Sequence, residues 1–156
     1  MSKQMIVKIK WDYGDKGPNY EVNMHIDLAR FEKQFTRAQY LLDSQIMTDM
    51  VPYMPMQTGT FINVTRAMSA AIAGSGKVVA AAPPMGRFLY EGKVMVDEVT
   101  GSPWARKGAK KKLTDRDIVF STAANPKAQK HWFEAAKRDH GKEWVRQAKK
   151  TAGGGK

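Results

Sequence analysis

Cysteine is absent from the sequence, and long hydrophobic runs are absent as well. Without cysteine the chain has no disulfide scaffold, no cysteine-ligated zinc site and no thiol nucleophile, and the absence fits a reducing compartment. No stretch approaches the ~18–20 apolar residues that a membrane span needs, and residues 1–11 lack the apolar core of a signal peptide. We therefore expect a soluble intracellular protein with no membrane partner.

Residue patterns for catalysis are also missing. Of the three histidines, His131 and His140 lie on one predicted helix, where about 100° per residue turns them to opposite faces, so they cannot share a metal ion. No phosphate-binding glycine loop, dinucleotide-binding pattern or metalloprotease spacing occurs. The acidic pairs Asp97-Glu98 and Asp115/Asp117 are interpreted as surface ion-pair partners. We expect no catalytic residue, no cofactor and no metal ion, and hence a protein that is not an enzyme.

Positive charge is unevenly distributed along the chain. Residues 1–100 contain 11 Lys and Arg against 10 Asp and Glu, whereas residues 101–156 contain 15 against 5. Such a basic region is typical of a surface that binds nucleic acid or an acidic protein. Solvated lysines on one loop and one helix face would give the same asymmetry, because no nucleic-acid reading motif accompanies the charge.

The first 50 residues predict a hairpin followed by a long helix. Apolar residues recur at every second position in 5–11 and 20–26, which predicts two antiparallel strands joined by the turn-rich residues 12–19. Apolar residues then recur at steps of three and four from Leu28 to Met50, which predicts an amphipathic helix with Asp27 as its N-cap. Two prolines that follow in the sequence, Pro52 and Pro55, end this helix.

The remaining segments are shorter. Residues 61–73 fit a strand or a helix equally well, and Gly74-Ser-Gly76 breaks the pattern. We expect strands at 78–82, 93–96 and 118–122, and a short helix at 84–91 that ends at Gly92. Asn125-Pro126 predicts the start of the last helix. Its expected buried stripe consists of Phe133, Ala136, His140, Trp144 and Ala148.

These elements predict an α+β fold, in which an antiparallel sheet carries the long amphipathic helix and the C-terminal helix on one face. Residues 1–151 are expected to form a single domain with a long basic loop at 101–117. Residues 152–156 are expected to be a flexible tail.

The expected basic loop contains a tryptophan, Trp104, that has no obvious core to join. This side chain either packs under its own loop or anchors a partner surface, where Trp and Arg are enriched. The loop also exceeds the ~4–6 residues that are typical of connections. We predict a partner interface made of Trp104, Arg106, Lys107, Lys110, Lys111 and Lys112.

Residues 52–60 predict a structural turn with Pro55, Thr58 and Gly59 as its main residues. Gly59 is expected at a backbone angle that disfavours a side chain, and the hydroxyl of Thr58 is expected to cap the segment that follows.

Three stretches together carry a family resemblance. Residues 51–60, VPYMPMQTGT, fit the pattern P-(x)n-TG-x-L, and residues 81–92, AAPPMGRFLYEG, are similar to P-Y-A-R-x-L-Y-x-G. Residues 122–144 contain NP-x-A-x-x-x-W-F-x-x-A-x-x-x-H-G-x-x-W. The chain thereby resembles the minor capsid and head–tail joining proteins of long-tailed bacteriophages. It departs from them at Phe61, where Leu is usual, and at Met85-Gly86, where Tyr-Ala is usual.

The resemblance implies a structural neck or tail-completion subunit of the virion. During assembly the subunit would be in the host cytoplasm. It implies a homomeric ring of six or twelve copies between head-closure and tail-terminator or tail-tube proteins, with a minor contact to packaged DNA. Basic residues of one copy would then face acidic residues of the next, such as Asp12, Asp15, Asp97 or Glu98. The alternative that the charge favours is a basic DNA-binding accessory protein.

Overall fold

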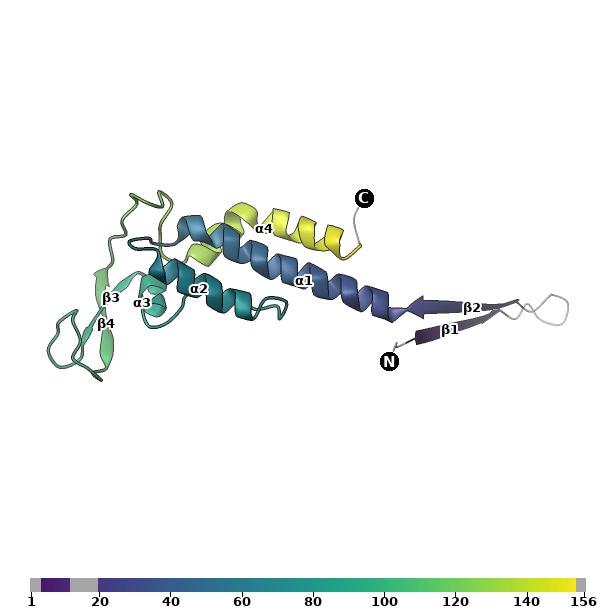
Figure 1. The fold of residues 1–156 in the computed structure, drawn as a ribbon, viewed down its shortest axis with the longest axis horizontal. Helices are drawn as coiled ribbons and strands as arrows, with labels where there is room; N and C mark the ends of the chain where they lie inside the picture. Colours follow the sequence, from purple (N-terminus) through teal and green to yellow (C-terminus); the bar gives the residue numbers. More distant parts are fainter. Residues whose placement is uncertain (1–3, 12–19, 154–156) are drawn as a thin grey trace.

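In the computed structural model, which describes residues 4–11 and 20–153, helices form the body and a β-hairpin lies at each end (Figure 1). In chain order the elements are β1 (Gln4–Trp11), β2 (Tyr20–Asp27), α1 (Leu28–Met50), the 3-10 helix η1 (Val51–Tyr53), α2 (Thr60–Ala71), α3 (Gly86–Glu91), β3 (Lys93–Asp97), β4 (Lys111–Asp117) and α4 (Trp132–Thr151). The predicted first hairpin and the long helix are confirmed, the helix with the predicted bounds.

The strands belong to two separate antiparallel sheets, β1–β2 and β3–β4. The α+β class and the C-terminal helix are therefore confirmed, but the helices pack mainly on one another instead of on one face of a single sheet. A two-stranded sheet is too narrow to bury a helix of 23 residues, which is about 35 Å long.

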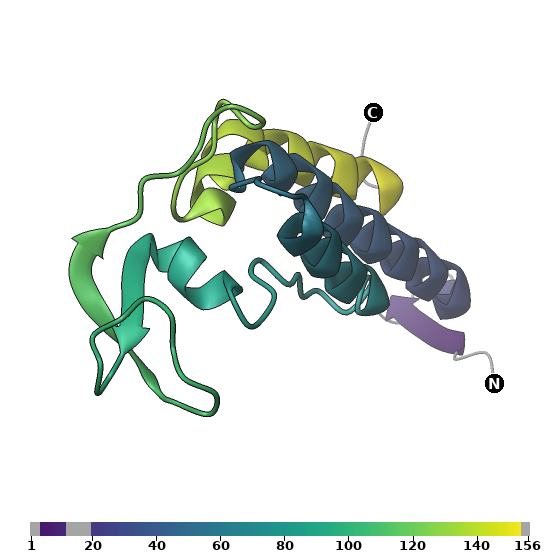
Figure 2. The ribbon, with the colours of Figure 1, turned by 60° about the vertical axis from the view of Figure 1, so that its left-hand side comes forward.

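Helix α1 is the axis of the body, with α4 along one side and α2 along another (Figures 1 and 2). Apolar side chains between these helices and η1 form the core, in which Met50, Tyr53, Met54 and Trp132 are almost completely buried. The expected stripe on α4 is confirmed in outline, because Ala136 and Trp144 are buried and the other three residues are half-buried.

Two polar side-chain contacts set the alignment of α1, η1 and α4. The Tyr53 hydroxyl donates to Asp139 Oδ2 at 2.5 Å, and Trp144 Nε1 donates to Asp49 Oδ2 at 2.6 Å. The first hydrogen bond raises the pKa of the Tyr53 phenol and lowers the pKa of the Asp139 carboxyl. Since later residues of α4 meet earlier residues of the α1–η1 segment, the two helices are antiparallel.

The ambiguous segment at 61–73 is helical, and the strand expected at 78–82 is wrong. Helix α2 turns Thr65 and Ser69 toward that segment. Ser69 Oγ donates to the carbonyl of Val79 at 2.9 Å and accepts from its amide at 3.0 Å, while Thr65 Oγ1 accepts from the Ala82 amide. Hydroxyl groups thus satisfy the backbone that a neighbouring strand would otherwise satisfy.

The break at residues 74–76 is held by a buried carboxylate. Asp43, on α1, accepts hydrogen bonds from the amides of Gly74 and Gly76 at 2.8 and 3.0 Å, and a third from Gln39. Both glycines have positive φ, a backbone conformation that glycine adopts without steric cost. This turn therefore fastens the end of α2 to α1.

The last part of the chain differs from expectation in two places. Residues 118–122 are not a strand, because the second strand of the C-terminal hairpin is at 111–117 and only the Ile118 amide bonds onward, to Gly92. The last helix begins at Trp132 and not at Asn125. The Asn125 side chain instead donates to the carbonyls of Val51 and Met54, at 3.0 and 2.9 Å.

The contact of Asn125 with η1 generates a prediction. Asn125→Ala should lower the free energy of unfolding by about 1–3 kcal/mol, because two carbonyls lose a half-buried donor. Urea denaturation measures the change, with Asn63→Ala on the exposed side of α2 as the matched control. Equal midpoints for the two variants would contradict the prediction.

Candidate functional site

The expected basic loop is shorter than predicted. Residues 98–110 connect β3 to β4, and Lys111 and Lys112 are in strand β4, where they pair with Asp97 and Val96. The expectation that both lysines are loop residues is wrong, because the strand register continues to Lys111. We call residues 98–110 the basic loop from here on.

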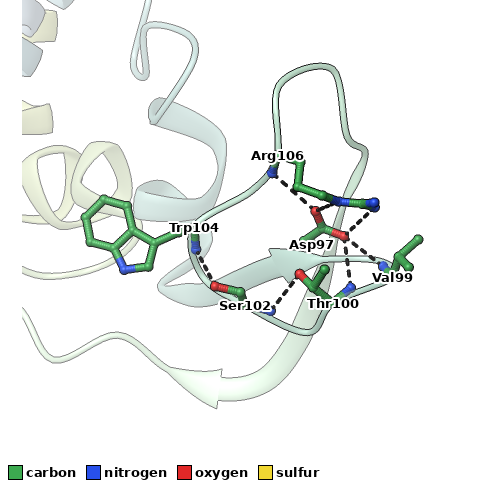
Figure 3. A network of polar contacts seen from close by, with 6 residues as sticks. All are labelled: Asp97, Val99, Thr100, Ser102, Trp104 and Arg106. Atoms are coloured by element: carbon green, nitrogen blue, oxygen red, sulfur yellow. Dashed lines mark hydrogen bonds and ion pairs between the residues drawn. The ribbon is translucent and has the colours of Figure 1, made fainter.

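The basic loop is organised around the carboxylate of Asp97, the last residue of β3 (Figure 3). Its Oδ1 accepts from the amides of Val99 and Thr100 at 2.8 and 3.1 Å. Its Oδ2 accepts from Nε of Arg106 at 3.0 Å and from the Arg106 amide at 3.3 Å. One side chain at the base of the loop therefore joins both ends of it.

Burial and charge make this ion pair internal to the chain. The Asp97 side chain is fully buried, whereas the Arg106 side chain is 58% exposed. The hydrogen bonds from the Arg106 guanidinium lower the pKa of the Asp97 carboxyl strongly, and the amides of Thr100 and Val99 lower it further. The expectation that Asp97 pairs with a neighbouring copy is thus wrong, and Arg106 is engaged within the loop before any partner arrives.

The indole of Trp104 lies at the surface. Its amide donates to Ser102 Oγ at 3.1 Å, and the preceding carbonyl, of Pro103, accepts from Lys111 Nζ at 3.1 Å. The side chain itself is 87% exposed and points away from the Asp97 carboxylate (Figure 3). Packing of Trp104 under its own loop is therefore wrong, and its apolar side chain is presented to solvent.

The lysines of the predicted interface differ in their surroundings. Lys111 Nζ is 5.8 Å from the ring centroid of Phe88. Lys107, Lys110 and Lys112 are exposed, and their side chains make no hydrogen bond or ion pair within the described residues. Three exposed positive charges, two in the basic loop and one in β4, are thus left without an acidic partner in this part of the chain.

The turn at 52–60 contains one confirmed and one wrong expectation. Gly59 has φ +79, in the left-handed region that disfavours a side chain. The Thr58 hydroxyl does not cap α2, which has no side-chain cap, and instead donates to Thr60 Oγ1 at 3.2 Å. Pro55 is half-buried and lines a groove.

That groove is the second surface of the site, and sequence reasoning missed it. It has a volume of about 800 Å³ and lies between residues 55–64, 83–89 and 118–124. No charged residue lines it, and exposed apolar side chains surround it, among them Met85 and Val119 at 51% and 94% exposure. Segments that are far apart in the sequence form the groove, so no local pattern indicates it.

The role of Asp97 was also missed, although its signal is local. An Asp followed by Glu-Val-Thr-Gly is typical of a turn in which the carboxylate accepts from the amides two and three residues later. Arg106 follows within the same loop as a charged partner.

Residues 4–11 and 20–153 contain no group of three or more His, Cys, Asp or Glu side chains that could hold a metal ion. Within the same ranges, no helix has the length and hydropathy that crossing a bilayer requires.

Comparison with known proteins adds no relative. No protein-family model matches the chain, and neither a curated protein nor a solved structure resembles it. The role of the exposed loop and the groove is therefore argued from their own chemistry.

The turn generates a prediction on two neighbouring residues. Gly59→Ala should destabilise the protein by about 1–2 kcal/mol, because alanine resists a left-handed backbone. Thr58→Ala should change stability by less than about 0.5 kcal/mol, because the hydroxyl caps nothing. Thermal and urea unfolding of both variants measure this. A Thr58→Ala loss equal to that of Gly59→Ala would show a cap after all.

The Asp97 network generates a prediction on pH. The pKa of the Asp97 carboxyl is lowered in the folded protein from its ordinary value of 3.8. The carboxylate therefore stabilises the loop at any pH above 3.8. This contribution is lost as the pH falls below 3.8. Amide exchange of residues 98–110, corrected for its intrinsic pH dependence, should be unchanged from about pH 7 to 5 and should accelerate as the pH falls below 3.8.

The variant Asp97→Asn should show the accelerated exchange already at neutral pH, because the amide cannot form the ion pair with Arg106. Asp115→Asn, an exposed aspartate of β4, is the matched control and should exchange like the unaltered protein. Unchanged exchange in Asp97→Asn would contradict the role of the carboxylate.

Proposed function

We propose that the chain is a non-enzymatic structural subunit of a bacteriophage virion neck, a minor capsid or tail-completion protein. In this proposal a homomeric ring of six or twelve copies joins the head-closure ring to the tail tube. Its neighbours are head-closure and tail-terminator or tail-tube proteins. The chain is in the host cytoplasm during assembly and in the virion afterwards.

The supporting observation is that one of the three stretches that carry the family resemblance, residues 122–144, contacts both of the others. In the stretch 122–144, Gln129 donates its amide to the Tyr53 carbonyl at 3.0 Å, and Asn125 bonds to two further carbonyls of the stretch 51–60. His131 donates its amide to the Tyr90 carbonyl at 3.0 Å, and the rings of Tyr90 and Trp132 are 4.7 Å apart. We call this joint the motif junction.

The motif residues of the motif junction, such as Gly92 and Trp132, serve to pack its segments together. Gly92 has φ +67, and a Cβ there would come within 2.9 Å of the Lys130 side chain. Trp132 is completely buried, and its Nε1 donates to the carbonyl of Ala80 at 2.8 Å. Residues that serve as a mechanical joint suit a structural subunit better than an enzyme, whose distinctive residues converge on an open site.

The surfaces left exposed suit a subunit that contacts several neighbours. The basic loop presents Trp104 at one end of the molecule, and the β1–β2 hairpin extends from the other end (Figure 1). A closed ring needs two different patches on each copy that meet head to tail. Exposed ion pairs contribute only ~0.2–1 kcal/mol each, so charge would orient the copies while apolar contacts hold them.

Loss of the chain in the phage that encodes it tests the proposal. Conditional loss should give filled heads and separate tails that do not join, and supply of the unaltered chain should restore complete particles. Normal particles without the chain, or a genomic neighbourhood free of portal, capsid and tail-tube genes, would contradict the proposal.

A basic DNA-binding accessory protein is the second candidate. Lys107 and Lys110 of the basic loop and Lys112 of β4 favour it, because none of them has an acidic partner within the described residues. Sizing with light scattering, with and without duplex DNA at two salt concentrations, tests it. Binding that weakens steeply with salt would support it, since phosphate contacts release counterions. No shift on DNA at low salt would remove it.

The exposure of Trp104 generates a prediction under the proposed function. Trp104→Ala should leave the free energy of unfolding within about 0.5 kcal/mol of the unaltered protein, because the side chain is 87% exposed. It should nevertheless reduce the yield of joined particles, because an exposed tryptophan is a typical binding hot spot. Val145→Ala, an exposed valine of α4, is the control. A large loss of melting temperature with normal assembly would contradict the prediction.

A further inference from the structure

The β1–β2 hairpin is an incomplete structural unit. Its register pairs Met5 with Ile26, Val7 with Met24, Ile9 with Val22 and Trp11 with Tyr20, so that every second pair consists of two apolar residues. Alternate residues of a strand share one face, and these pairs therefore belong to one face of the hairpin. A two-stranded hairpin alone is marginally stable in water and needs a third strand or a packing surface.

No helix of the same chain supplies that surface. The hairpin continues outward from the N-terminal end of α1, away from the helical body (Figure 1). Its two strands form a sheet by themselves, and β1 pairs with β2 alone in the described residues. Both outer edges of the hairpin thus lack a ladder partner in this part of the chain.

The apolar groove also lacks a strand partner in the part of the chain that the structure describes, because one of its walls has unpaired backbone amides. The segment that forms one of its walls, residues 118–122, has the composition of a strand, Ile-Val-Phe-Ser-Thr. Only the Ile118 amide has a backbone partner, and the amides of residues 119–122 donate no backbone hydrogen bond within the described residues. Val119 beside them is 94% exposed. The groove therefore offers an unpaired backbone edge beside an uncharged apolar surface.

The two incomplete features lie too far apart to complete each other within one chain. The hairpin precedes α1 and the groove begins after it, and this helix of 23 residues is about 35 Å long. A strand of eight residues spans only about 26 Å, so neither β1 nor β2 extends along the whole of α1 even if the hairpin folds back along it.

We propose that the β1–β2 hairpin of one copy docks in the apolar groove of the next copy, where one of its edges pairs with residues 118–122 as a third strand. The apolar face of the hairpin then covers the groove, and the backbone of residues 119–122 gains its hydrogen bonds. This mode of strand addition combines main-chain bonds for affinity with apolar contacts for specificity. Because the groove contains no charged residue, its occupant is an apolar strand and not a nucleic acid.

The inference rests on the proposed ring, since it names the contact between copies. Hairpin and groove are two different patches at opposite ends of the molecule, as a head-to-tail interface requires. The contact repeats from copy to copy. The copies form a closed ring when the rotation angle between neighbours is a whole fraction of about 360°.

Cysteine pairing tests the contact directly, because the chain has no cysteine of its own. We would make two single variants, Lys8→Cys in the hairpin and Val119→Cys beside the groove, mix them at high concentration and add a short bismaleimide. The expected result is a covalent dimer in the mixture and little product from either variant alone, since the contact joins unlike patches. Lys137→Cys, at an exposed position of α4, is the matched control for random collision.

Other cross-linking patterns would overturn the inference. Products of Val119→Cys with itself, or of Lys8→Cys with itself, would indicate a two-fold contact. A mixture that reacts no faster than the Lys137→Cys control would mean that the hairpin does not occupy the groove of another copy.

A second measurement reports the predicted third strand. Amide exchange of residues 119–122 should be slower in the assembled form than in the monomer, because their amides become donors. Val119→Asp should weaken self-association by at least about tenfold while the melting temperature stays unchanged, because a carboxylate would have to enter an apolar contact. Val145→Asp on α4 should have neither effect.

Failure of this inference and failure of the proposed function give different results. If the chain forms a ring in the virion neck but Val119→Asp assembles normally, the interface is wrong and the function stands. If the hairpin and the groove cross-link but the chain is dispensable for joining heads to tails, the interface stands and the function is wrong.

Discussion

Burial of the apolar stripe on α1 is the constraint on which the rest of the structure depends. The stripe is longer than any sheet in the described residues is wide, so other helices must cover it. Helix α4 does so over the C-terminal part, and Tyr53 and Trp144 fix its alignment through two carboxylates. Helix α4 ends beside Gln34, and the first turns of α1 are left uncovered, where Phe31 and Phe35 are 47% and 60% exposed.

The motif junction follows from the same constraint. To lie along α1, helix α4 must begin close to η1, and the residues before it have to turn there. Asn125 and Gln129 make that turn against η1, while His131, with φ 51, redirects the chain into the helix. The motif residues around Trp132 are thus explained by geometry, and their surroundings leave the loop, the groove and the hairpin free to meet other molecules.

Patterns of period two and of three to four residues predicted the first hairpin and α1, since each of these elements depends on its own residues. These patterns could not exclude a strand at 78–82, because they report only on neighbouring residues. The backbone of this segment is satisfied by the hydroxyls of Ser69 and Thr65, which come ten and more residues earlier in the sequence. The start of α4 was placed too early for the same reason: an Asn-Pro pair is typical of a helix start, but here Asn125 bonds to η1 instead. In the site, the loop position of Trp104 allowed either packing under the loop or exposure, and the structure shows exposure. The Asp97 turn had a local signal, and the groove had none. Residues 12–19 and 154–156, which include Asp12, Asp15 and most of the expected tail, lie outside the described residues.

An electron cryomicroscopy map of the head–tail junction of the assembled phage is the most direct measurement of what this chain does. We expect a ring of six or twelve copies on the tail axis, between the head-closure ring and the tail tube, with Trp104 at a contact with a neighbouring protein. A single copy, a two-fold dimer away from the axis, or a junction without this chain would contradict the proposed neck function.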